Sequence, residues 1–241
     1  KKDTLSAIEK LKDVTVHYNK WEQNLNEVPN RIVKISLKNL RMQNPQTMAD
    51  ALGTTGDVFI QKSQLGGGSP MIRGFATNRV LLVIDGVRMN NAIYRSGNLQ
   101  NVLSLDALSI DDAEIIFGPG SLIYGSDAIG GVMDFHTLQP KFATPKNQLV
   151  SGNALLRYSS ANKENTAHFN FNVASSKLSF LTSFTYNNFN DLQMGKNGGD
   201  KSYLRNEYVE RINNADVVVT NDNPRVQKFS GYFQKNLLSK L

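Results

Sequence analysis

The feature that most constrains this 241-residue chain is a strict alternation of apolar and polar side chains after residue 149. It runs through four segments, residues 150–158, 167–173, 178–186 and 227–237. Successive side chains of a β-strand point to opposite faces, so each segment predicts a strand with one apolar side. Such strands build either the wall of a transmembrane β-barrel or a soluble β-sandwich.

The connections between these segments favour the barrel. The first two are short, whereas residues 187–225, rich in Asn, Asp and Gly, separate the third segment from the fourth. Outer-membrane barrels have short turns at one end and long loops at the other, and a compact soluble domain rarely holds so long a structureless loop. Four strands cannot close a barrel, so we expect residues 149–241 to be the first four strands of a longer chain.

Residues 31–140 have a different pattern, with short elements separated by glycine corners. Asp85-Gly86 between two β-prone runs predicts a tight hairpin, and the glycines of 66–70 predict a flexible loop. Strands are expected at 31–35, 57–62, 80–84, 114–117 and 130–137, and helical stretches at 36–41, 47–52, 104–108 and 122–124. These elements predict a small α+β domain over 31–140, preceded by a separate N-terminal segment, residues 1–30.

Three motifs in this domain resemble the plug domain of TonB-dependent outer-membrane receptors over about residues 13–138. They are MIRGF at 71–75, VLLVIDGVRMN at 80–90 and DAEIIFGPGSLIYGSDAIGGVMDFHT at 112–137. The structural signature of the plug falls on Arg73, Gly74, Asp85, Gly86, Gly118, Pro119, Tyr124, Gly125, Gly130 and Gly131. The family usually has Arg before Gly-Pro, and that Arg is thought to pair with acidic groups on the barrel wall; here the residue is Phe117.

This difference leaves open which residues hold the plug to the wall. Arg73 offers a guanidinium with five donors, which suits either a wall carboxylate or a contact inside the plug. The resemblance implies an α+β plug domain followed by antiparallel β-strands of an incomplete transmembrane β-barrel. The complete barrel is expected to have about 22 strands, the size class whose lumen is plugged.

The resemblance also implies a function: import of a scarce nutrient across the bacterial outer membrane, in contact with outer-membrane lipid and driven by a TonB-type energy-coupling protein. An iron-siderophore, haem or a corrinoid fits as ligand. The loop from Asn90 is similar to loops of haem-protein receptors, which favours haem. The plug is expected in the barrel lumen with the N-terminus in the periplasm, and neither enzymatic activity nor a cofactor is implied.

Two sets of site residues follow from the resemblance. The TonB contact, a candidate TonB box, is expected at Leu11, Lys12, Asp13, Val14, Thr15 and Val16. Strand addition to a partner uses backbone hydrogen bonds, so its sequence requirements are loose. The substrate-facing plug loops are expected to present Gln64, Ser69, Asn91, Tyr94, Arg95 and Asn98.

Other classes of protein fit less well. The chain has no cysteine, which excludes disulfides and zinc–thiolate sites, and no apolar run reaches the roughly 18–20 residues of a membrane helix. The net charge of +6 is scattered along strand-like stretches, so no nucleic-acid partner is expected. A surface adhesin or a soluble β-sandwich binding module remains the alternative. A nucleotide-binding enzyme is remote, because the run from Gly118 fails G-x-G-x-x-G at its last position.

Overall fold

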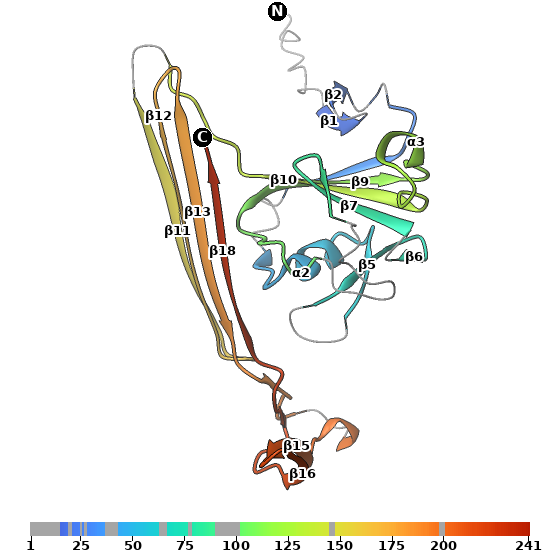
Figure 1. The fold of residues 1–241 in the computed structure, drawn as a ribbon, viewed down its shortest axis with the longest axis vertical. Helices are drawn as coiled ribbons and strands as arrows, with labels where there is room; N and C mark the ends of the chain where they lie inside the picture. The colour runs from blue at the N-terminus through green and yellow to red at the C-terminus, as the bar shows by residue number, and fades with distance from the viewer. Residues whose placement is uncertain are drawn as a thin grey trace, which may run out of the picture.

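The computed structural model describes residues 15–18, 21–24, 26, 28–36, 43–62, 67–76, 79–89, 102–144, 148–197 and 201–241. An α+β unit lies beside a tall four-stranded sheet, and a separate hairpin stands beyond one end of that sheet (Figure 1). The predicted order, an α+β unit followed by antiparallel strands, is confirmed. None of the described helices is long and apolar enough to cross a membrane.

A five-stranded sheet forms the centre of the α+β unit. Its strands lie in the order β3 (Ile32–Ser36), β9 (Ile110–Phe117), β10 (Gly131–Thr137), β7 (Val80–Ile84) and β8 (Val87–Arg88). Strand β10 runs parallel to β7 and antiparallel to β9. The predicted hairpin joins β7 to β8, and Asp85 and Gly86 have φ values of 46° and 80°, as a two-residue primed turn requires.

Two layers cover the faces of this sheet. On one side lie α2 (Met48–Gly53) and a small sheet of β4 (Phe59–Gln61), β5 (Ser69–Ile72) and β6 (Phe75–Ala76). On the other side lie α3 (Ser121–Tyr124) and the hairpin of β1 (Thr15–Tyr18) and β2 (Trp21–Asn24). Each layer buries its own apolar cluster against the sheet, with Met48, Leu52 and Ile72 in one cluster and Val16 and Tyr124 in the other.

The prediction of a flexible loop at 66–70 was wrong at its C-terminal end. Ser69 and Pro70 belong to β5 and are buried. A Cβ on Gly68 would lie 2.5 Å from Ile60 Cγ2 and 3.0 Å from Ala49 Cβ. This glycine therefore permits close packing between α2 and the small sheet, and the absence of a side chain does not indicate a mobile segment here.

The helix predicted at 104–108 was also wrong, because the segment forms turns. The Asp106 carboxylate accepts hydrogen bonds from the Leu108 backbone N–H at 3.0 Å and from the Ser109 hydroxyl at 2.5 Å. An Asp side chain that bonds its own local backbone offers the chain an alternative to a helix. The helix expected at 36–41 falls outside the described residues, except Ser36, which ends β3.

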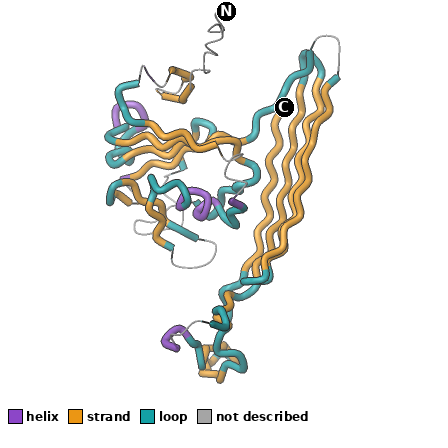
Figure 2. The backbone as a smooth tube through the Cα atoms, turned by 180° about the vertical axis from the view of Figure 1, so that it is seen from behind, coloured by secondary structure: helices purple, strands orange, loops and turns teal. Residues whose placement is uncertain are grey.

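The tall sheet consists of β11 (Leu149–Ser159), β12 (Glu164–Ala174), β13 (Ser179–Phe189) and β18 (Tyr232–Lys240), all antiparallel and in that order. Figure 2 shows from behind that these strands run side by side over their whole length. The predicted alternation is confirmed. The apolar side chains point away from the α+β unit, with Leu156 86% exposed and Leu237 74% exposed, whereas polar side chains such as Ser183 and Thr185 are buried.

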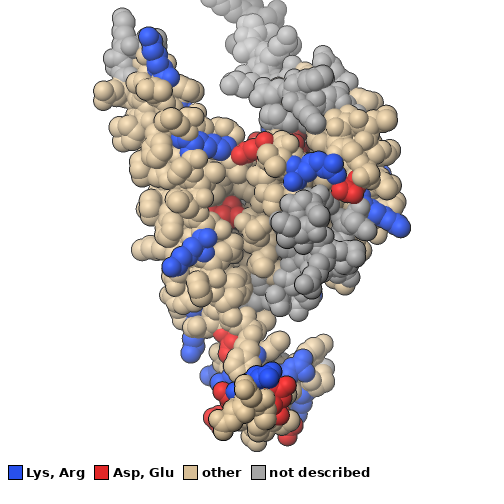
Figure 3. Space-filling model, in the orientation of Figure 1, with Lys and Arg blue, Asp and Glu red and all other residues tan. Residues whose placement is uncertain are grey.

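The long segment before β18 was expected to be structureless, but it is folded, and Figure 3 shows acidic and basic side chains gathered around its hairpin. It contains β14 (Leu192–Gln193), a short 3-10 helix (Lys201–Tyr203), a hairpin of β15 (Glu207–Ile212) and β16 (Ala215–Thr220), and β17 (Val226–Gln227). Asn213 and Asn214 both have positive φ, 49° and 63°, in the two-residue turn. This hairpin was not expected from the sequence, although Asn-Asn ahead of the β-branched run at 217–219 is a signal that could have predicted it.

Candidate functional site at the contact between the two units

The inner face of the tall sheet meets the α+β unit through hydroxyl and carboxylate groups. The Thr185 hydroxyl donates to Asp106 Oδ2 at 2.5 Å, and the Ser183 and Ser109 hydroxyl oxygens lie 2.9 Å apart. His168 Nδ1 lies 2.6 Å from the Thr185 hydroxyl and extends this network along the sheet. The turn at 105–109 therefore presents polar groups to the sheet, which explains why the inner residues of the strands are polar.

Arg157 of β11 also contacts the α+β unit across this boundary. Its Nε donates to Glu164 Oε1 at 2.7 Å, and its Nη1 donates to the Pro45 carbonyl at 2.8 Å. The other Glu164 oxygen accepts from Gln46 Nε2 at 2.6 Å. The Arg157 and Glu164 side chains are only 7% and 0% exposed. The ion pair is thus buried and bonded from both units, as a buried charge requires.

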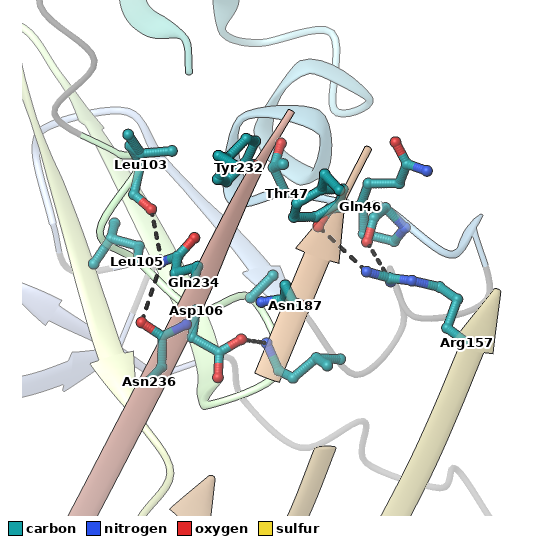
Figure 4. A pocket seen from close by; sticks show the side chains of 14 residues that line it. Gln46, Thr47, Leu103, Leu105, Asp106, Arg157, Asn187, Tyr232, Gln234 and Asn236 are labelled. Atoms are coloured by element: carbon teal, nitrogen blue, oxygen red, sulfur yellow. Dashed lines mark hydrogen bonds between the residues drawn. The ribbon is translucent and has the colours of Figure 1, made fainter. Parts of the chain in front are cut away.

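A small cavity lies beside this ion pair (Figure 4). Its volume is about 20 Å³, and its lining includes Leu105, Asp106, Arg157, Tyr232, Gln234 and Asn236. At the edge of the cavity, Gln234 Nε2 donates a hydrogen bond to the Leu103 carbonyl at 3.0 Å. A space of this size holds about one water molecule. The cavity is therefore part of a packed polar boundary and is far too small to hold a nutrient.

Asp85 forms a second connection between the units. Its carboxylate accepts the Thr137 backbone N–H at 2.9 Å and lies 3.0 Å from the Lys240 ammonium of β18. Burial opposes ionisation, but the Thr137 hydrogen bonds and Lys240 outweigh it and lower the pKa of this carboxyl. Asp85, expected as a structural residue of the hairpin turn, thus also contacts the tall sheet.

Phe117 and Arg73 contact each other within the α+β unit. The guanidinium carbons of Arg31 and Arg73 each lie 4.9 Å from the centre of the buried Phe117 ring, and Arg31 also pairs with Asp57 at 2.9 Å. Arg73 pairs with no carboxylate of the tall sheet among the described residues. The described contacts with this sheet instead include those of Arg157, Asp85 and Asp106. The alternating sequence around Arg157 gives no sign of a buried ion pair.

Two of the expected signature glycines have a clear steric role. A Cβ on Gly130 would lie 2.3 Å from the Phe75 Cβ, so only glycine permits this contact between β6 and the start of β10. Gly118 has a φ of 94°, in the region that favours glycine, where the chain leaves β9. Tyr124 is buried in the cluster under α3, in keeping with a structural role.

The structure describes few of the residues expected to contact partners. Thr15 and Val16 lie in β1, with Val16 buried, while Leu11, Lys12, Asp13 and Val14 lie outside the described residues. Gln64, Asn91, Tyr94, Arg95 and Asn98 also lie outside them. Ser69 is 1% exposed within β5, so the expectation that it lies on a surface loop was wrong.

The comparisons with known proteins agree with this architecture. Residues 24–132 match the model of the TonB-dependent Receptor Plug Domain. The chain is 38% identical over 128 residues to the vitamin B12 transporter BtuB of Vibrio vulnificus, covering 52% of this chain and 20% of that protein. It is 37% identical over 110 residues to the heme/hemopexin utilization protein C of Haemophilus influenzae, covering 43% and 14%.

A solved structure shows the same fold at low identity. The pyoverdine outer membrane receptor FpvA of Pseudomonas aeruginosa PAO1 superposes with a TM-score of 0.59 at 16% identity, over 74% of this chain and 25% of that one. The chain thus spans between 14% and 22% of the length of the first curated relatives that it matches. The chain therefore carries a TonB-dependent receptor plug domain, followed by antiparallel strands that match the N-terminal portion of such receptors.

Proposed function

We propose that this chain is the plug and the first wall strands of an outer-membrane receptor that imports a scarce nutrient with TonB-coupled energy. The observation that carries the proposal is the orientation of the tall sheet, whose polar face lies on the plug and whose apolar face points outward. A soluble sheet buries its apolar face, whereas a barrel wall turns that face to lipid. In the complete receptor, further strands would continue this wall around the plug.

The nutrient belongs to the classes named for the relatives. One relative is a vitamin B12 transporter, another a heme/hemopexin utilization protein, and a structural neighbour is a pyoverdine receptor. We infer that this chain serves the uptake of a corrinoid, haem or an iron-siderophore, held by the plug loops and the outer loops of the wall. Binding assays of the complete receptor with haem, siderophores and cobalamin would identify the ligand class. The chain itself acts in transport and catalyses no reaction.

The N-terminal segment is proposed to face the periplasm and to contact the TonB-type partner through residues 11–16. Two contacts of the described part support this role. The Lys34 ammonium of β3 donates to the Thr15 carbonyl at 3.1 Å, and Val16 is buried among Ile32, Leu81 and Ile116. A pull on this segment would act directly on β3, which among the described strands lies at the edge of the central sheet beside β9.

Deletion of residues 11–16 from the complete receptor tests this assignment. We expect uptake to be lost while ligand binding at the outer surface is kept, because the ligand site lies on the other side of the plug. Deletion of residues 1–6, which removes the same length of chain, is the control and should leave uptake unchanged. Normal uptake after loss of residues 11–16 would contradict the role given to this segment.

Detergent dependence separates this proposal from an adhesin or a soluble sandwich module. The outward side chains Leu156, Phe233 and Leu237 are mostly exposed and lie on one face of the sheet. We expect the protein to require detergent for extraction and to aggregate when detergent is removed. A monomeric protein in detergent-free buffer would contradict the lipid-facing assignment.

A further inference from the structure

Five charged side chains meet on the β1 side of the central sheet. Lys34 comes from β3, Asp112 and Glu114 from β9, and Asp134 and His136 from β10. The strand register places Glu114 between Lys34 and Asp134, and places Asp112 opposite His136. Side chains two positions apart share a face, so the carboxylates and the imidazole form a two-by-two array across adjacent strands.

The contacts within this array are close. His136 Nδ1 lies 2.6 Å from Asp112 Oδ1, and His136 Nε2 lies 3.7 Å from Asp134 Oδ2. The Lys34 ammonium lies 3.4 Å from Asp112 Oδ2 and 3.3 Å from Glu114 Oε1. Glu114 and Asp134 are buried, so these charges interact with little screening by water.

The array has more negative than positive charge. Three carboxylates face one ammonium and one imidazole, so these five side chains together carry a net charge of −1 even when His136 is protonated. The adjacent pair of Asp85 and Lys240 is neutral and does not change this balance. Asp134 Oδ1 is buried and has no hydrogen-bond donor among the described residues. A buried carboxylate oxygen without a donor is costly and indicates an ion or a water as its partner.

We propose that Asp112, Glu114 and His136 form a binding site for one divalent transition-metal ion, with Zn²⁺ as the reference ion and the buried Asp134 carboxylate beside it. The candidate ligand atoms of Asp112, Glu114 and His136 all lie within 4.8 Å of one another. Zinc bonds to nitrogen and oxygen are about 2.0–2.2 Å long, so ligand atoms around one ion lie up to about 4.4 Å apart, and small side-chain rotations suffice. An imidazole among carboxylates suits Zn²⁺ or Mn²⁺ better than Mg²⁺.

Lys34 is the natural competitor for this ion. Its ammonium lies between Asp112 and Glu114 and also donates to the Thr15 carbonyl. An ion bound by the carboxylates would displace the ammonium and release its contacts with both acids. The site therefore lies directly beneath the N-terminal strand β1, so the ion would alter how that strand is held.

Calorimetric titration of the purified, chelator-treated protein in detergent with ZnCl₂ and MgCl₂ tests the proposal. We expect one Zn²⁺ per chain and at least about tenfold weaker Mg²⁺ binding. Asp112→Asn and His136→Gln should each weaken Zn²⁺ binding by at least about tenfold. Lys34→Met should tighten it, because the competing cation is gone. Asp127→Asn, a carboxylate paired with Arg88 at the surface, is the control and should bind Zn²⁺ as the wild type does.

Three results would overturn the proposal: no saturable Zn²⁺ binding to the wild type, wild-type affinity in the Asp112→Asn and His136→Gln variants, or no gain in the Lys34→Met variant. Circular dichroism would establish that each variant is folded. If a variant does not fold, X-ray absorption at the zinc edge of the wild type decides the matter. One imidazole nitrogen with oxygen ligands supports this site, whereas two or more imidazoles place the zinc elsewhere.

Discussion

Replacement of Arg157 by Met tests how the plug is attached to the tall sheet. The change removes the guanidinium from the buried Glu164 carboxylate and leaves the Pro45 and Gln46 carbonyls without that donor. Loss of one partner from a buried ion pair costs about 3–5 kcal/mol. At about 1.4 kcal/mol per tenfold, the folding equilibrium should fall by a factor of roughly a hundred to several thousand.

The measurement is equilibrium urea unfolding in detergent micelles, followed by circular dichroism, with the free energy of unfolding taken from the midpoint and slope. Arg211→Met is the matched control, because Arg211 lies 3.8 Å from Asp216 with both side chains about two-thirds exposed, at 69% and 67%. That variant should stay within about 0.5 kcal/mol of the wild type.

A double variant isolates the charge from the other contacts. Arg157→Met combined with Glu164→Gln removes the Glu164 charge that Arg157→Met alone leaves unpaired, so the double variant should be more stable than Arg157→Met. A loss below about 1 kcal/mol for Arg157→Met would refute the reasoning, since that is the behaviour of a solvated surface pair. A double variant no more stable than Arg157→Met would refute the role of the buried charge.

The chain has no cysteine, and the Ser109 and Ser183 hydroxyl oxygens lie 2.9 Å apart. The double variant Ser109→Cys with Ser183→Cys should therefore form a single disulfide that blocks uptake until a reductant is added. A disulfide that leaves uptake intact would show that the plug need not leave this sheet. Gly68→Ala should lower the free energy of unfolding by about 1–3 kcal/mol, because its Cβ would lie 2.5 Å from Ile60 Cγ2, and unchanged urea unfolding would argue against that close packing. Burial opposes protonation of His136, yet Asp112 and Asp134 raise its pKa from 6.5 to about 10. The contribution of protonated His136 to the free energy of unfolding should therefore be complete below pH 6.5 and lost as the pH rises to 10. Thermal unfolding should show this decline in the wild type and not in His136→Gln.

Much of the fold is readable from local chemistry. The alternation after residue 149 predicts both the strands and the face that each side chain takes, because a strand has only two faces. Asp85-Gly86 predicts its hairpin, because few residues other than Gly, Asn and Asp adopt positive φ at low cost. The capping box of Thr47 and Asp50 likewise begins α2 where apolar helical spacing starts.

The remaining features depend on contacts between distant segments. Gly68 alone predicts a flexible segment, and only its close approach to Ile60 and Ala49 shows that it is a packing position. The sequence of 104–108 predicts a helix, whereas the structure has turns there, because the Asp106 carboxylate accepts hydrogen bonds from its own turn and from Thr185. The contact of Arg157 with Pro45 spans more than a hundred positions, and nothing local to either residue predicts it.

The polar inner face of the tall sheet has a consequence for how the plug can leave it. Separating two apolar surfaces in water costs about 25 cal/mol for every Å² newly wetted. Separating hydroxyls such as Thr185 from carboxylates such as Asp106 costs about 1.5–3 kcal/mol for each hydrogen bond, because water takes the place of each partner only as it leaves. A boundary of this kind closes tightly when dry and opens in small steps as water enters, so a modest steady force can part it one hydrogen bond at a time.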